Sequence, residues 1–235
     1  MQALSDKAPA RAIRSYVLRA GRITPAQERA LTELWPRYGV DFQSTPLDLS
    51  ALFGRKAPVT LEIGFGNGEH LLRRASAEPE RDFLGVEVHR PGIGHLLLAA
   101  ERLGLANLRV LAHDAVEVLE QQIAPGSLEE VQLLFPDPWP KKRHHKRRLV
   151  QPAFIELVAS RLARGGRLYI ATDWQPYAES MRTDLDACAA LRNCTEPGTP
   201  VAAGPEANHP PTRFERRGER LGHRIHRLLF MRAGD

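Results

Sequence analysis

The 235-residue sequence predicts an α/β fold, in which helices cover both faces of a mostly parallel central sheet. Three observations predict this fold. Short apolar strands alternate with helical patterns from residue 59 onward, and such alternation requires crossover connections between parallel strands. A glycine-rich turn, Gly64-Phe65-Gly66-Asn67-Gly68, follows the first of these strands. Hydrophobic residues make up 43% of the chain, which is enough to bury one sizeable core.

The elements of this fold are expected in a regular order. Six apolar runs predict strands at 59–63, 83–88, 108–112, 131–135, 167–172 and 225–231. Helical spacing of apolar residues predicts helices that begin near 69, pass through 93–103 and 116–119, and occupy 152–162. The helix at 152–162 is expected to end at Gly165-Gly166 as its C-cap. A loop rich in Pro and Gly, 196–211, precedes the final strand.

The first fifty or so residues show no strand–helix alternation and are rich in Arg and Pro. One short helix is expected near 24–34, where Thr24 can cap the helix and Pro25 can occupy its first turn. We therefore predict a basic, partly ordered N-terminal extension at 1–56 and a single α/β domain at 57–235.

Charge and composition indicate the kind of partner. The net charge is +5, and the run KKRHHKRR at 141–148 is strongly basic, so an acidic partner such as a nucleic acid is favoured. Cys188 and Cys194 form no disulfide framework and have no zinc-finger spacing, so no metal site is expected. No apolar stretch has membrane-spanning length and no secretory signal is evident, which indicates a cytoplasmic protein that contacts no membrane.

An acidic residue stands at or near the end of each of the first four strands of the domain: Glu62, Glu87, Asp114 and Asp137. Ligands of parallel sheets bind at the carboxyl ends of strands, and Glu87 follows Gly64 at about the 20-residue distance typical of an acid that binds a ribose diol. Four carboxylates would repel a pyrophosphate, so NAD fits poorly. S-adenosylmethionine carries a sulfonium, an ammonium and hydroxyls, and is the cofactor that the pattern favours.

Each acid also has a simpler interpretation, as a solvated turn residue or a helix N-cap. For Asp114 alone the two interpretations stay open. The ordered series of four favours the cofactor site, whereas a glycine-rich turn alone would be weak evidence.

The segment Phe135-Pro136-Asp137-Pro138-Trp139-Pro140 follows the fourth strand. Its prolines predict a stiff loop, with Asp137 and Trp139 in extended geometry. A rigid acid beside an aromatic ring suits a flat base, and the basic run downstream suits phosphates. The alternatives are ordinary packing for Trp139 and a solvated charged face for the basic run.

These motifs resemble the bacterial tRNA (guanine-N7-)-methyltransferase family along nearly the whole chain. The most specific stretch is FPDPWPKKRHHKRRL at 135–149, combined with ATDW at 171–174. Further matches are IRSYVLRAGRITPAQERAL (13–31), LEIGFGNGEHLL (61–72), FLGVEVHRPGI (83–93) and TRFERRGERLGH (212–223). The departures are conservative.

The resemblance implies a Rossmann-like class I methyltransferase domain whose last strand is antiparallel. It implies methyl transfer from S-adenosylmethionine to N7 of a guanine in the tRNA variable loop. Cofactor contacts then fall on the glycine-rich turn and the acids: Glu62, Gly64, Gly66, Glu87, Asp114 and Asp137. Asp137 is also the implied catalytic residue. Substrate contacts fall on Lys141, Asp173, Thr212, Arg213, Phe214 and Glu215, and RNA contacts on Arg143, His144, His145, Lys146, Arg147 and Arg148.

Two other functions remain to be compared with this one. A related methyltransferase acting on an exocyclic amine or a small molecule would share the stiff loop, but the Asp-Pro-Trp sequence and the basic run disfavour it. A non-catalytic RNA-binding protein with a vestigial fold is disfavoured by the intact acid series. The sequence leaves a monomer and a homodimer equally open.

Overall fold

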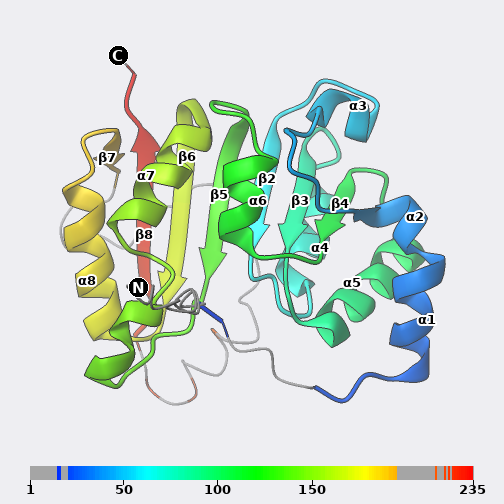
Figure 1. Ribbon diagram of the computed structural model, residues 1–235, viewed down its shortest axis with the longest axis horizontal. Coiled ribbons are helices and arrows are strands. Elements are labelled where there is room, and N and C mark those ends of the chain that lie inside the picture. The colour runs from blue at the N-terminus through cyan, green and yellow to red at the C-terminus, as the bar shows by residue number, and fades with distance from the viewer. Residues whose placement is uncertain are drawn as a thin grey trace, which may run out of the picture.

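The computed structural model describes residues 15–16, 21–194, 215, 220, 222 and 224–234. In this part of the chain one sheet contains every strand (Figure 1). Its strands are β1 (Gly39–Val40), β2 (Val59–Ile63), β3 (Asp82–Val86), β4 (Leu108–Leu111), β5 (Leu128–Leu134), β6 (Leu162–Thr172), β7 (Leu191–Asn193) and β8 (His226–Arg232).

Helices connect most of these strands. They are α1 (Pro25–Glu33), α2 (Trp35–Tyr38), α3 (Leu49–Phe53), α4 (Glu69–Ala77), α5 (Arg90–Leu103), α6 (Ala115–Gln121), the 3₁₀ helix η1 (Lys142–Arg147), α7 (Pro152–Arg161) and α8 (Gln175–Asp186). None of the helices in the described residues combines the length and the apolar content needed to cross a lipid bilayer.

The strand order is β1-β4-β3-β2-β5-β6-β8-β7. Strands β1 to β6 pair in parallel, whereas β8 is antiparallel to both β6 and β7. The predicted parallel sheet with an antiparallel last strand is therefore confirmed. The order reverses direction between β2 and β5, and such a switch point is where parallel sheets bind ligands at the carboxyl ends of their strands. These ends lie at the bottom of Figure 1.

The two faces of the sheet are covered by different helices. Side chains of α1, α2, α4 and α5 pack with Phe83, Leu108 and Val110 in one hydrophobic cluster. Side chains of α6, α7 and α8 pack with Leu84 and Leu111 in the other cluster. Because successive residues of a strand point to opposite faces, these alternating memberships place the two groups of helices on opposite sides. The prediction of helices on both faces is confirmed.

The region before β2 is more regular than its sequence suggested. The predicted helix near 24–34 is confirmed as α1, and Thr24 and Gln27 form a reciprocal capping box at its start. The expectation that these residues contain only one short helix was wrong, however. Helices α2 and α3 and strand β1 follow α1, and β1 pairs in parallel with β4. Ala30 and Tyr38 are buried in the core. The division at 56/57 stays a prediction.

The expected role of Gly165-Gly166 was also wrong. Helix α7 ends at Arg161, and Leu162 is already extended and pairs with Leu128 of β5. The two glycines lie inside β6, where the register with β5 shifts and Gly165 has a φ of 75°. A Cβ on Gly166 would lie 2.8 Å from the Ala163 carbonyl oxygen. The glycines thus form a β-bulge rather than a helix cap.

Candidate cofactor and acceptor site

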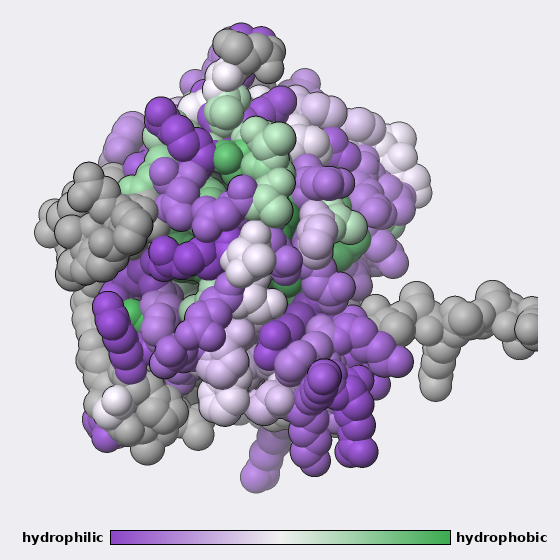
Figure 2. Space-filling view, turned by 90° about the vertical axis from the view of Figure 1, so that its left-hand side faces the viewer, coloured by the Kyte–Doolittle hydropathy of each residue, from purple (hydrophilic) through white to green (hydrophobic). Residues whose placement is uncertain are grey.

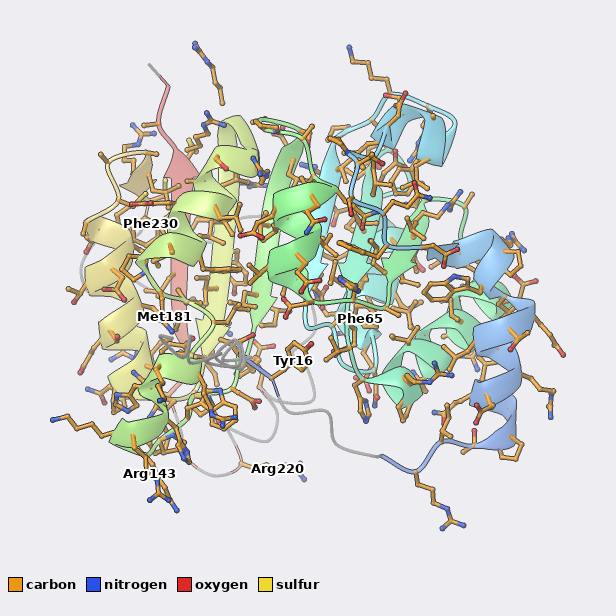
Figure 3. The ribbon with its side chains drawn as sticks, viewed as in Figure 1. Tyr16, Phe65, Arg143, Met181, Arg220 and Phe230 are labelled. Carbon is orange, nitrogen blue, oxygen red and sulfur yellow. The ribbon has the colours of Figure 1, made fainter. Side chains whose placement is uncertain are left out.

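A cavity of about 250 Å³ opens at the switch point between β2 and β5. It is formed by the end of β2, the turn into α4, the residue before α5 and the end of β5. Its lining residues are Glu62, Gly64, Phe65, Gly66, Asn67, Glu69, His70, His89, Leu134 and Phe135. Figure 3 shows Phe65 at this edge of the sheet, with Tyr16 from the N-terminal segment nearby.

The glycine-rich turn adopts backbone conformations that favour glycine. Gly64, Gly66 and Gly68 all have positive φ, at 69°, 59° and 75°. A Cβ on Gly68 would lie 2.2 Å from Leu96, so this glycine permits close packing of α4 on α5. A Cβ on Gly64 or Gly66 would meet no atom within 4 Å. These two glycines therefore leave open space beside the cavity, which a ligand can approach.

Of the four acids expected at the strand ends, Glu62 is the one that lines the cavity. Its side chain is buried, and its Oε2 lies 2.9 Å from Nδ1 of His70 in the first turn of α4. Burying a carboxylate is costly unless it is hydrogen-bonded, and His70 supplies that contact. The pair fixes the orientation of the carboxylate at the mouth of β2.

Glu87 connects the end of β3 to the glycine-rich turn. Its Oε1 accepts backbone N–H bonds from Val88 at 2.7 Å and His89 at 3.0 Å, and its Oε2 accepts from Gly66 at 2.8 Å. A carboxylate has about four acceptor sites, so roughly one remains for an external hydroxyl. Glu87 therefore holds the turn in place and keeps limited capacity for a ribose.

Asp114 follows β4 and is the N-cap of α6, where its Oδ1 accepts from the Val116 N–H at 2.9 Å. The simpler interpretation is thus correct for one of its two oxygens. Half-buried, Asp114 can still offer the second oxygen to a ligand amino group, so capping and binding are compatible here.

The charge of the cavity suits a cationic ligand with hydroxyl groups. Two carboxylates, Glu62 and Glu69, are among the lining residues, and none of these residues is Lys or Arg. A pyrophosphate would have no cation to pair with, whereas a sulfonium and an ammonium would be stabilised. Together with the open space beside Gly64 and Gly66, this charge fits S-adenosylmethionine.

The proline-rich loop leaves β5 directly beside this cavity. Phe135 lines the cavity, its N–H donates to the Ala171 carbonyl oxygen at 2.8 Å, and the exposed Asp137 follows two residues later. The expected extended geometry of Trp139 was wrong, since its φ is 44°, and that of Phe135 is 54°. Both residues precede a proline, and a non-glycine residue at positive φ is strained by about 1–3 kcal/mol.

Trp139 is held on several sides. Its Nε1 donates to the Ser15 carbonyl oxygen at 3.3 Å, and the Arg147 guanidinium lies 5.2 Å from its ring centroid. The His144 ring meets it edge-on, with centroids 5.8 Å apart. Burial of the imidazole and the nearby cations, Arg143 first among them, lower the pKa of His144. Both effects disfavour the protonated form of the imidazole.

Residues 142–147 of the basic run form η1, and the side chains of the run differ in their exposure to solvent. Lys141, Lys142, Arg143 and Lys146 are exposed, and Figure 2 shows strongly hydrophilic side chains gathered at the lower end of the molecule. Figure 3 shows Arg143 pointing away from the body of the protein. Arg148 differs, because it is buried and its Nε donates to the Pro138 carbonyl oxygen at 2.9 Å. The expectation that Arg148 contacts RNA does not fit this position.

Of the other expected substrate residues, the structure describes Asp173 and Glu215. Asp173 follows β6 and lines a second, open hollow of about 260 Å³ with Trp174, Gln175, Pro176, Arg224 and His226. Glu215 is buried, and its Oε1 accepts from Arg227 at 2.9 Å. Thr212, Arg213 and Phe214, as well as the 196–211 loop, lie outside the described residues.

Several residues at the site carried no signal in the sequence. His70 is separated from Glu62 by the glycine-rich turn, and only the helical start at Glu69 could have placed it there. Ser15 contacts Trp139 across 124 positions of sequence, which no local pattern reveals. Tyr177 was likewise missed; its ring lies under Arg148, and burial raises its pKa to about 12.

Comparison with known proteins agrees with this geometry. A methyltransferase family model described as "Putative methyltransferase" matches residues 56–228. A tRNA (guanine-N(7)-)-methyltransferase of Halorhodospira halophila is 55% identical over 96% of this chain and 97% of its own length. A protein of the same name from Leifsonia xyli subsp. xyli is 56% identical over 96% and 98% of the two chains.

Solved structures show the same fold at low sequence identity. The aminoglycoside resistance methyltransferase NpmB1 is 15% identical, covers 82% of this chain and 95% of its own, and has a TM-score of 0.51. A mutant 16S rRNA (adenine(1408)-N(1))-methyltransferase from Catenulisporales acidiphilia is 16% identical over 77% and 88%, with a TM-score of 0.52. The fold is thus that of class I methyltransferases, and the identity and coverage of the relatives show that the chain belongs to the tRNA (guanine-N(7)-)-methyltransferase family.

Proposed function

We propose that this protein transfers a methyl group from S-adenosylmethionine to N7 of a guanine in the variable loop of tRNA, in the cytoplasm. The observation that carries the proposal is one juxtaposition. An acid-lined cavity at the β2–β5 switch point opens beside the loop that bears Asp137 and Trp139, and the exposed cations of η1 follow that loop. The relatives named above act, by their names, on guanine N7 of tRNA.

The contacts of the proposed cofactor residues support their roles. S-adenosylmethionine supplies a methyl group on a positively charged sulfur. Glu62, oriented by His70, offers a carboxylate to positive charge in the cavity. Glu87 has one acceptor site left for a ribose hydroxyl, and the second oxygen of Asp114 can accept from an amino group. Gly64 and Gly66 leave the space that the ligand enters.

Asp137 is the proposed catalytic residue. Guanine N7 carries an in-plane lone pair and no proton, so methylation at N7 needs no base to remove a proton from that atom. The purine gains positive charge as the methyl group arrives, and a carboxylate fixed beside the ring stabilises that charge. Asp137 can also accept hydrogen bonds from the N–H groups of the guanine edge, with Asp173, beyond β6, as a second acceptor.

The experiment is methylation of tRNA from a strain that lacks this modification, with a labelled methyl donor and mapping of the product by nuclease digestion and mass spectrometry. We expect one N7-methylguanosine in the variable loop. Methylation of an exocyclic amine, or of no tRNA, would contradict the proposal. A protein that binds tRNA but no S-adenosylmethionine in calorimetry would instead be a vestigial RNA-binding protein.

Asp137→Asn should lose most turnover while tRNA binding survives, because Asn keeps the size of the side chain but removes the charge that stabilises the methylated purine. Single-turnover methylation and a filter-binding assay measure the two quantities separately. A variant that turned over as fast as the parent would remove Asp137 from the mechanism.

The exposed cations of η1 should contact phosphates. Replacing Lys142 and Arg143 by Gln should weaken tRNA binding and make the slope of log K against log salt less steep by about 0.9 per lost phosphate contact, which filter binding at several salt concentrations measures. Calorimetry with S-adenosylmethionine is the control, and its Kd should stay at the parent value. Equal losses of both affinities would indicate misfolding.

A further inference from the structure

The last arginine of the basic run does not share the environment of the others. Arg148 is 7% exposed, whereas Lys141, Lys142, Arg143 and Lys146 are exposed to solvent. Its Nε donates to the Pro138 carbonyl oxygen at 2.9 Å, and its Nη2 lies 3.2 Å from Nε2 of His145. Among the described residues no carboxylate forms an ion pair with it. A guanidinium buried without a carboxylate is costly, so its position calls for an explanation.

One face of the Arg148 guanidinium packs against the core. Its Cζ lies 4.6 Å from the ring centroid of Tyr177, which is fully buried in α8. The Tyr177 hydroxyl oxygen accepts the Val150 N–H at 3.1 Å, and the Gln151 amide donates to the Arg148 carbonyl oxygen at 2.6 Å. The side chain and the backbone of Arg148 are thus both tied to the start of α7 and to α8.

The acceptor of the Nε bond is the peptide group that precedes Trp139. Because the Pro138 carbonyl and the Trp139 nitrogen share one planar peptide, holding that carbonyl fixes one side of the rotation about the Trp139 φ angle. The other side is fixed by the ring, which contacts Ser15, His144 and Arg147. Strained conformations persist where the surroundings over-determine them, and the φ of 44° at Trp139 is determined in this way.

We propose that Arg148 is a positioning residue: it clamps the Pro138–Trp139 peptide onto Tyr177 and so holds Asp137 and Trp139 at the edge of the cavity, rather than contacting RNA phosphate. The proposal rests on the proposed function only for the role of the loop. It divides the basic run into exposed cations that face the RNA and one buried cation that shapes the loop.

The test compares Arg148→Lys with Arg143→Gln in the full-length protein. Lys keeps the charge of Arg148 but loses the planar donor that reaches Pro138 and lies over the Tyr177 ring. We expect Arg148→Lys to lower kcat at saturating tRNA at least tenfold, with an unchanged KM and an unchanged salt slope of binding. Arg143→Gln should raise the KM and make the salt slope less steep by about one contact.

A spectroscopic readout separates positioning from stability without using RNA. The chain has three tryptophans, Trp35, Trp139 and Trp174, so 5-fluorotryptophan labelling gives three assignable ¹⁹F resonances. Arg148→Lys should shift or broaden the Trp139 resonance and leave that of Trp35, in α2 beside the edge strand β1, unchanged. The matched control is Arg74→Lys, another buried arginine, which should lower Tm without moving the Trp139 resonance.

The outcomes are distinct. The proposal is overturned if Arg148→Lys leaves the Trp139 resonance in place, or if its only effect is the less steep salt slope of a lost phosphate contact. If Arg148→Lys does not fold, Arg148→Gln is measured in the same way, and failure of both to fold would assign Arg148 to stability alone. If the parent protein methylates no tRNA while the Trp139 resonance of Arg148→Lys moves as expected, the proposed function is wrong but the positioning role of Arg148 is supported.

Discussion

Gly66→Ala separates backbone strain from ligand exclusion, because the chain contains a matched control. Gly66 and Gly104 have φ values of 59° and 64°, and a Cβ on either would meet no protein atom within 4 Å. Gly66 lines the cavity, whereas Gly104 is the C-cap of α5. Alanine in the left-handed region costs about 1–2 kcal/mol, so each variant should lose about 2–8 °C in Tm.

The two variants should differ only with ligand present. S-adenosylmethionine at 100 times its Kd stabilises the parent, and equally Gly104→Ala, by about 2.7 kcal/mol. A methyl group forced into the ligand's space at Gly66 costs about 1–3 kcal/mol, and a middle value of about 2 kcal/mol weakens the Kd about 30-fold. The same ligand concentration then stabilises Gly66→Ala by only about 0.9 kcal/mol.

Thermal unfolding with and without S-adenosylmethionine measures this difference, and calorimetry gives the Kd directly. If Gly66→Ala gained as much Tm from the ligand as Gly104→Ala, the glycine-rich turn would not border the cofactor. If Gly66→Ala unfolded much earlier than Gly104→Ala without ligand, the Cβ would be meeting protein rather than open space.

Two further predictions concern stability. Arg74→Met should lower the free energy of unfolding by about 3 kcal/mol, because it leaves Glu130, which is 0% exposed, with one fewer cationic partner. Urea denaturation measures this loss. The control is Arg102→Met, on an exposed part of α5, and an equal loss of stability in that variant would contradict the reasoning. Burial raises the pKa of Tyr177 to about 12, and burial with a hydrogen bond to Glu101 raises that of Tyr38 to about 12. The unfolded chain loses these phenol protons near pH 10 while the native state keeps them, so stability is full below pH 10 and declines between pH 10 and 12. Tyr177→Phe should make that decline shallower in denaturation measured from pH 9 to 11.5, and an unchanged slope would show that Tyr177 ionises normally.

Local patterns predicted most of the fold because the relevant physics is local. Apolar runs of strand length and helical spacing located β2 to β5, β8, α1 and α5 within a few residues, whereas β6 begins at Leu162 rather than at 167. The cap at Thr24 was predicted from the residue types at the start of the helix, and Gln27, three positions later, completes a capping box in the structure. The failures were also local in origin: Gly165-Gly166 permit a bulge as readily as a helix cap, and only the pairing of Leu162 with Leu128 selects the bulge.

The candidate site was predicted unevenly. The cavity does lie at the carboxyl ends of the strands, beside Glu62 and the glycine-rich turn. The conformation of Trp139 was not predictable, because a proline on its C-terminal side disfavours what the structure adopts. Contacts from Ser15 and Arg148, both outside the loop, hold that conformation.

The sequence by itself determined the layered α/β fold, the position of the glycine-rich turn and the presence of acids at the strand ends, because these depend on periodicity, on glycine and on local residue order. Only the tertiary structure decided which side chains of the basic run are exposed to solvent. Lys146 and Arg148 lie two positions apart in the same cationic run, but Lys146 is exposed, whereas Arg148 is buried over Tyr177. Burial depends on how α7, α8 and the proline-rich loop pack together, and that packing cannot be predicted from a run of like charges.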